Sequence, residues 1–232
     1  MEYIRGILMY IIGVTGYSGA GKTEFANTLL EQNNRIYTCE LDKFWLEIVY
    51  ENKQEMIEKF GSEVFNPDGS YNGKYRLTCD IESIKDFFDN AAPEIVERFF
   101  RLVEQLSDQY DIFIAEYVHL PQTSLWKLCN KRVLITSAEE ERYFRLKSRE
   151  HLPCDPLQAK VRDELAEHAW ESIKTTNYSH IYNNYDDGFY TQAKNFSEDV
   201  QKDIIKQPHI YVSQALKEYK IPRKISILNK IS

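Results

Sequence analysis

The chain has 232 residues, of which 43% are hydrophobic and 28% charged, as expected for one globular domain with a small insert. Its formal net charge of −7 argues against nucleic-acid binding through a basic surface. The four cysteines are widely spaced, the N-terminus reads as a strand rather than a secretory signal, and no apolar run approaches the length of a membrane span, so we expect a cytoplasmic protein without membrane or nucleic-acid partners.

Strand and helix patterns alternate along most of the chain. The expected elements are a strand at 9–14, a helix at 24–30, a strand at 35–41, a helix at 43–60, helical sequence at 81–106, strands at 111–117 and 132–136, helices at 138–148 and 157–174, a strand at 179–182, helices at 197–206 and 211–219, and a short strand at 224–228. Pro93 interrupts the long helical pattern, which therefore predicts two helices there. The residues at 66–69 give a strong turn signal.

This alternation predicts an α/β fold with a parallel sheet and helices on both of its faces. Ligands of such sheets bind at the carboxyl ends of the strands. The informative positions are therefore those that directly follow a predicted strand, namely 16–23, Asp42, 116–119 and Ser137.

The strongest motif is the segment at 16–23, which reads GYSGAGKT and fits the pattern GxxxxGK[ST] at every fixed position. Glycines let the backbone curl so that its N–H groups face phosphate oxygens, and the start of the following helix adds partial positive charge. Lys22 is expected to bridge the outer phosphates of ATP, and the Thr23 hydroxyl is expected to bind Mg²⁺. The expected phosphate-binding residues are Gly16, Ser18, Gly19, Ala20, Gly21, Lys22 and Thr23.

Three polar residues at strand ends are further candidates. Asp42 suits a general base that accepts the proton of an acceptor hydroxyl, although an aspartate there also suits a helix N-cap. Glu116 follows four apolar residues and could hold Mg²⁺ through water or face the substrate, or it could simply emerge from the sheet. His119 could contact the substrate, although a satisfied loop histidine is the plainer interpretation.

Arg145 and Arg149 lie four residues apart and therefore on one helical face. Guanidinium groups suit the charge that develops on a transferred phosphoryl group, although a solvated basic face is the alternative. Phe44 is a candidate for contact with the substrate, while packing under its helix is the other interpretation.

Several segments together are similar to the dephospho-coenzyme A kinase family. They are Gly13-Val14-Thr15-Gly16, the loop itself, Leu41-Asp42-Lys43, Lys59-Phe60-Gly61, Pro67-Asp68-Gly69, Lys74 with Leu77, the strand at 130–135 with Glu141, Arg145 and Arg149, and Ile181-Tyr182-Asn183-Asn184. The resemblance covers about residues 10–205 and is most specific between Phe60 and Leu77.

The resemblance implies a three-layer P-loop NTPase fold with a helical substrate insert at about 60–106 and a lid at about 145–165. It also implies an enzyme that uses ATP and Mg²⁺ to phosphorylate the ribose 3′-hydroxyl of dephospho-coenzyme A, a nucleotide-like small molecule. Arg149 would be the lid arginine, Asn183 would bind ATP, and Lys74 would face the acceptor. The loop and Asp42-Lys43-Phe44 also resemble uridine-kinase-like enzymes, so a nucleoside or nucleoside-monophosphate kinase stays as an alternative. The segment at 116–120 reads EYVHL where the family has Asp followed by Pro-Leu-Leu, so a non-catalytic nucleotide-binding protein is a second alternative.

Overall fold

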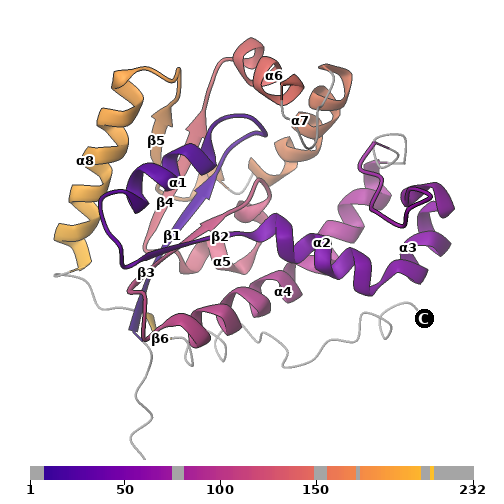
Figure 1. Cartoon of the computed structure of the whole chain (residues 1–232), viewed down its shortest axis with the longest axis horizontal. Helices are drawn as coiled ribbons and strands as arrows, with labels where there is room; N and C mark the ends of the chain where they lie inside the picture. The colour runs from indigo at the N-terminus through magenta and orange to yellow at the C-terminus, as the bar shows by residue number, and fades with distance from the viewer. Residues whose placement is uncertain (1–7, 75–80, 149–155, 171–172, 205–209, 212–232) are drawn as a thin grey trace, which may run out of the picture.

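The computed structural model describes residues 8–74, 81–148, 156–170, 173–204 and 210–211 (Figure 1). Five parallel strands form the sheet in the order β2-β3-β1-β4-β5, so the predicted α/β architecture is confirmed. These strands are β1 (Leu8–Thr15), β2 (Ile36–Glu40), β3 (Ile112–Glu116), β4 (Lys131–Thr136) and β5 (Ser179–Tyr182). A short sixth strand, β6 (Ile210–Tyr211), pairs antiparallel with the start of β1.

The helices cover the sheet on both sides. Their bounds are α1 (Lys22–Leu30), α2 (Leu41–Glu51), α3 (Lys53–Phe60), α4 (Ile81–Leu106), α5 (Ser124–Leu128), α6 (Glu139–Lys147), α7 (Pro156–Trp170) and α8 (Asp187–Ile204), with short 3-10 turns at Ser62–Val64, Leu120–Gln122 and Ile173–Thr175. Figure 1 shows α1 lying beside α8, while α4 and α5 lie under the other side of the sheet. None of the described helices is both long enough and apolar enough to cross a membrane.

Alternate residues of the central strand β1 point to opposite faces, and each set joins a different core. Met9 and Ile11 pack with the aromatic residues of α4 and with α2 and α5. Ile12 and Val14 pack with the apolar faces of α1 and α8. The sheet therefore lies between two layers of helices, with one core on each of its faces. These are the three layers that the sequence predicted.

The segment at 81–106 is one helix, not two, so the prediction of a break at Pro93 is wrong. A proline in a helix interior costs about 3 kcal/mol. The apolar stripe that follows it is fully buried at Ile95, Val96, Phe99 and Phe100. Each such side chain contributes roughly 1.5–3 kcal/mol, so burial of the stripe outweighs the local cost of the proline.

Other boundaries differ from the expected ones. The segment 43–60 forms two helices, α2 and α3, and the helix expected at 197–206 begins much earlier, at Asp187. Asp186 caps that start, because its carboxylate accepts the Phe189 N–H at 3.0 Å. Tyr211 begins no helix but belongs to β6, and the remainder of 211–219 and the strand expected at 224–228 lie outside the described residues.

Candidate active site

The loop between β1 and α1 is tightly curled at the carboxyl edge of the sheet. Gly19 and Gly21 have φ angles of +79° and +95°, which residues with a side chain rarely adopt. A Cβ atom on Gly21 would lie 2.0 Å from the Asn183 amide nitrogen, and one on Gly19 would lie 2.8 Å from the Arg142 carbonyl oxygen. The glycines therefore let the loop take this path and let neighbouring segments pack directly on it.

Lys22 is the first residue of α1, and its side chain is buried. Its ammonium group turns back over the loop and donates to the carbonyl oxygens of Gly16 at 3.1 Å and Tyr17 at 3.3 Å. The lysine ammonium group therefore lies over the loop, as the motif predicts. Its positive charge can act on an anion that binds there.

Thr23 and Glu116 bring the loop and β3 together. The Thr23 hydroxyl donates to Glu116 Oε1 at 2.7 Å, while Glu116 Oε2 is buried without a hydrogen-bond partner among the described residues. Burial raises the pKa of the Glu116 carboxyl above its ordinary value, and the Lys22 charge and the Thr23 hydrogen bond counteract this. A carboxylate oxygen in such a position suits a cation or a water bound to one.

Asp42 lies in the first turn of α2, directly after β2, and its side chain is exposed. The N-cap position of this helix is Glu40, so the interpretation of Asp42 as the cap is wrong. Glu40 is the register partner of Glu116 across the β2–β3 pair. The charges of Glu40 and Asp42 both raise the pKa of Glu116, which puts these three acids at one edge of the sheet.

Arg145 and Asn183 hold the loop from the side of β4 and β5. Arg145 donates to the Gly19 carbonyl oxygen at 3.1 Å and to the Ser137 hydroxyl at 3.0 Å, and its guanidinium group lies 3.9 Å from the centre of the Tyr185 ring. The Asn183 amide, which is fully buried, donates to the Ala20 carbonyl oxygen at 2.9 Å. Both residues therefore touch the loop, and their role in ATP binding stays a prediction.

A cavity of about 430 Å³ opens beside the loop. Its lining brings together predicted residues from three separate parts of the chain, namely the loop, the end of β3 and α6, and adds others. The lining residues are Gly19, Gly21, Lys22, Thr23, Glu24, Asn27, Glu116, Glu141, Phe144, Arg145 and Tyr185. Among the described residues there is no cluster of three or more histidine, cysteine or acidic side chains that would hold a metal without other ligands.

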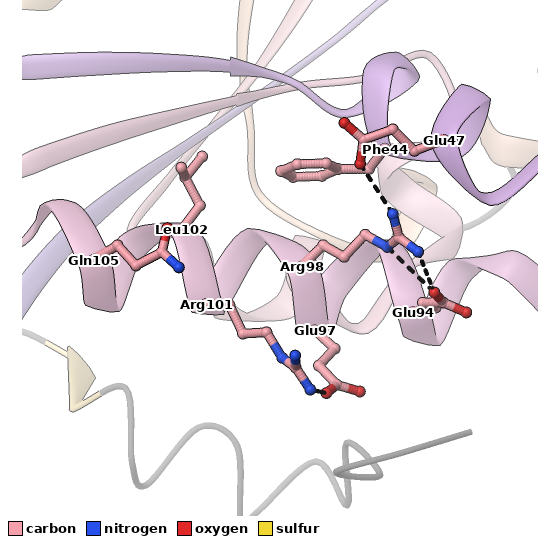
Figure 2. A pocket seen from close by; sticks show the side chains of 8 residues that line it. All are labelled: Phe44, Glu47, Glu94, Glu97, Arg98, Arg101, Leu102 and Gln105. Carbon is pink, nitrogen blue, oxygen red and sulfur yellow. Dashed lines mark hydrogen bonds and ion pairs between the residues drawn. The ribbon is translucent and has the colours of Figure 1, made fainter. Parts of the chain in front are cut away.

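Phe44 lies elsewhere. It is partly buried and lines a second cavity of about 410 Å³ between α2 and α4, where Figure 2 shows it opposite Arg98 and Leu102. Arg98 binds Glu47 of α2 at 2.9 Å and Glu94 of its own helix at 2.5 Å, so this cavity has largely satisfied charges. The position agrees with packing under the helix, and contact with the substrate stays a prediction.

The remaining acceptor-side candidates are also outside the phosphate cavity. His119 lies just after β3, with its ring stacked on Phe88 at 4.5 Å and edge-on to Tyr117 at 5.5 Å. Lys74 is exposed at the end of the turn that follows α3. Arg149 falls outside the described residues.

The sequence did not predict two aromatic residues that line the cavity, Phe144 and Tyr185. Phe144 is 71% exposed although it lines the cavity, and Tyr185 has a φ of +59° that turns it under Arg145. Phe144 directly precedes Arg145, one of the two arginines that the sequence singled out, which is a weak signal. Tyr185 has no motif, because its position depends on the fold of the segment after β5.

These features together define a P-loop kinase. A curled glycine loop joins a buried strand to a helix, and Lys22 turns back over it. Thr23 is hydrogen-bonded to a carboxylate at the end of β3, and an arginine flanks the loop. No family model matches this chain. Curated relatives are more specific: the chain is 28% identical over 162 residues to a dephospho-CoA kinase of Dehalococcoides mccartyi, which covers 67% of this chain and 81% of the relative.

A dephospho-CoA kinase of Leptospira interrogans is 24% identical over 173 residues, which covers 73% of this chain and 82% of that protein. The crystal structure of TT1252 from Thermus thermophilus superposes with a TM-score of 0.60 at 21% identity, over 83% of this chain and 97% of the other, and this likeness shows the fold. The resemblance to dephospho-CoA kinases that the sequence motifs indicated is therefore confirmed.

Proposed function

We propose that this chain is an ATP-dependent kinase that phosphorylates the ribose 3′-hydroxyl of dephospho-CoA. The observation that carries the proposal is a phosphate-loop cavity, with Lys22 and Arg145 beside it, in a chain similar to curated dephospho-CoA kinases over two thirds of its length. The match extends over about four fifths of the length of each of these relatives, so the similarity includes most of that enzyme.

The loop would hold the phosphates of ATP through its backbone N–H groups and the N-terminus of α1. Lys22 and Arg145 supply the positive side chains that line the cavity. Fixed charges and dipoles in a partly closed site stabilise the charge of the transferred group more than water does, because they need no rearrangement during the reaction.

The residues present fit Mg²⁺. The Thr23 hydroxyl and the unpartnered Glu116 oxygen lie together at the cavity wall, and oxygen ligands are those that Mg²⁺ prefers. Thr23 would bind the ion directly and Glu116 through water, and when bound the ion neutralises charge on the phosphates.

Asp42 would orient the acceptor hydroxyl and accept its proton as the oxygen bonds to the γ-phosphorus and ADP leaves. It is exposed at the sheet edge that carries Glu116, so a substrate hydroxyl can approach it from solvent. Glu40 is a weaker candidate, because its carboxylate pairs with Lys43 at 2.8 Å. Roles for Phe44, Lys74 and His119 toward the acceptor and for Arg149 in the lid stay predictions, as do the insert at 60–106 and the lid at 145–165.

We place this reaction in the cytoplasm. Cys39 and Cys129 are buried and unbridged, which suits a reducing compartment. The proposed partners are small molecules, namely ATP and the nucleotide-like acceptor.

The deciding experiment uses the purified full-length protein with Mg²⁺ and ATP and, in parallel, dephospho-CoA, adenosine, uridine and a nucleoside monophosphate. Chromatography of the products should show ADP and CoA in equal amounts and no phosphorylated nucleoside. Turnover of a nucleoside or a monophosphate in place of dephospho-CoA would identify the other kinase class. ATP binding without turnover of any acceptor would instead support the non-catalytic alternative.

A further inference from the structure

Arg142 of α6 and Asp163 of α7 form an ion pair behind the phosphate loop. Arg142 Nη1 donates to Asp163 Oδ1 at 3.0 Å and Nη2 donates to Oδ2 at 2.6 Å, and both side chains are buried. Tyr143 adds a hydrogen bond to the same carboxylate at 3.3 Å. Two parallel hydrogen bonds between an arginine and a carboxylate fix orientation as well as distance.

The same arginine touches the loop. Its Nη1 atom also donates to the Ser18 carbonyl oxygen at 3.2 Å, and its guanidinium group lies 4.7 Å from the centre of the Tyr17 ring. Tyr17 in turn stacks at 3.9 Å on Trp170, the last residue of α7. Two consecutive residues of the loop are therefore attached to α7, one through Arg142 and one through an aromatic contact.

Three consecutive carbonyl groups of the loop are held from outside in this way. Arg142 binds that of Ser18, Arg145 that of Gly19 and Asn183 that of Ala20. In a planar trans peptide the C=O and the following N–H point in opposite directions. Arg142 does not line the cavity, so holding the Ser18 carbonyl on its side turns the Gly19 N–H away from Arg142. The Ala20 N–H donates within the loop to the Tyr17 carbonyl oxygen at 3.1 Å.

We propose that Arg142, oriented by Asp163 of α7, is a positioning residue that presets the phosphate loop for ATP. Neither residue lines the phosphate cavity, so both act through the loop and not on the nucleotide. A buried ion pair is often replaceable by apolar residues at little cost in stability. The two residues therefore do more for the shape of the loop than for the stability of the fold.

This proposal rests on ATP as the ligand of the loop, which belongs to the proposed function, but not on the identity of the acceptor. The test is calorimetric titration of Mg²⁺-ATP, without an acceptor, into the wild type and into the double variant Arg142→Met with Asp163→Leu. Because the Ser18 carbonyl loses a charged donor, the dissociation constant should rise about tenfold while the melting temperature stays close to that of the wild type. An unchanged dissociation constant in the folded double variant overturns the proposal.

A second variant, which leaves Arg142 in place and is read by the ratio of two Michaelis constants, tests the same coupling. Asp163→Asn has the same shape but lacks the charge that orients Arg142, so it should weaken ATP binding about threefold. The Michaelis constant for ATP should rise and that for the acceptor should not, a separation that a loss of general stability would not produce. Equal affinity in Asp163→Asn and the wild type contradicts the coupling to α7.

The control is Lys131→Met with Asp203→Asn, which removes another ion pair, with a separation of 2.6 Å. Lys131 begins β4, so this pair lies at the opposite end of the strand from the loop. The control should leave ATP affinity unchanged. A wild type that binds ATP but does not phosphorylate dephospho-CoA would refute the acceptor and leave this inference standing. A wild type that binds no ATP would refute both.

Discussion

The phosphate side and the acceptor side of this protein are built differently. On the phosphate side, Lys22, Thr23 and Asn183 make hydrogen bonds to the loop or to β3, and each bond is short and directed. On the acceptor side, Asp42 and Lys74 are exposed. The proposed function therefore implies that phosphate binding is prepared in the free protein, whereas acceptor recognition depends on groups that the acceptor itself must order.

The largest expected effect is on Lys22. Lys22→Ala removes the charge at the mouth of the loop and should lower kcat about a thousandfold, because that charge acts on the transferred group. The far-UV circular dichroism spectrum should stay unchanged, since the ammonium group serves the loop, where it donates to the carbonyls of Gly16 and Tyr17, and is not part of an apolar core. Lys194→Ala, at an exposed position on α8, is the matched control and should retain wild-type turnover.

Asp42 tests the acceptor side. Asp42→Asn removes the proton acceptor and should lower kcat about a hundredfold, while the dissociation constant of ATP measured by calorimetry stays within about threefold. Glu40→Gln is the paired control, because this neighbouring acid is joined to Lys43 and should be nearly silent in kcat. If Glu40→Gln lost the activity and Asp42→Asn kept it, the base would be Glu40.

Glu116 should separate activity from stability. Glu116→Gln keeps the shape but removes a negative charge from the proposed magnesium site, so turnover at saturating ATP should fall about tenfold. Because burial raises the pKa of this carboxyl in the folded protein, its ionised form opposes folding at neutral pH. The variant should therefore have the higher melting temperature in the absence of ligand.

The pH dependence of that stability difference has a definite sign. As the pH falls toward 4.5, the ordinary value for this carboxyl, wild-type Glu116 becomes protonated and its cost to folding disappears. The melting temperatures of the wild type and Glu116→Gln should therefore converge on acidification, as scanning calorimetry would show. A gap that widens toward low pH would mean that the ionised carboxylate stabilises the fold.

Phe44 gives the smallest expected effect. Its ring lies between α2 and α4, so Phe44→Leu should reduce the free energy of unfolding by about 1 kcal/mol. The Michaelis constant for dephospho-CoA should change by no more than about threefold, as expected for a site not coupled to the ligand. A tenfold rise in that constant without loss of stability would show that the ring contacts the acceptor.

The two regions also differ in how far the sequence predicted them. The phosphate loop follows from a local pattern, because strand, glycines, lysine and threonine are contiguous, and the structure places these residues as expected. The α/β architecture could also be predicted, because the alternation of strand and helix patterns is local in the sequence. The unbroken α4 could not, because burial of the residues after Pro93 depends on the sheet that they cover.

The contact of Arg142 with the loop could not be predicted from the sequence. Arg142 and Asp163 are 21 positions apart on two helices, and Arg142 meets Ser18 across 124 positions. Nothing in the spacing of an arginine and an aspartate indicates that they will face each other. Such pairs are created by tertiary packing, which places α6 and α7 against the loop.

The most direct measurement is the fate of the γ-phosphoryl group of ATP in the presence of dephospho-CoA. Phosphorus NMR of the products, with the wild type and Lys22→Ala compared side by side, should show a new phosphate on the ribose 3′ position, formed in equal amount with ADP by the wild type alone. A folded wild-type protein that binds Mg²⁺-ATP yet leaves the 3′-hydroxyl unmodified would contradict the account.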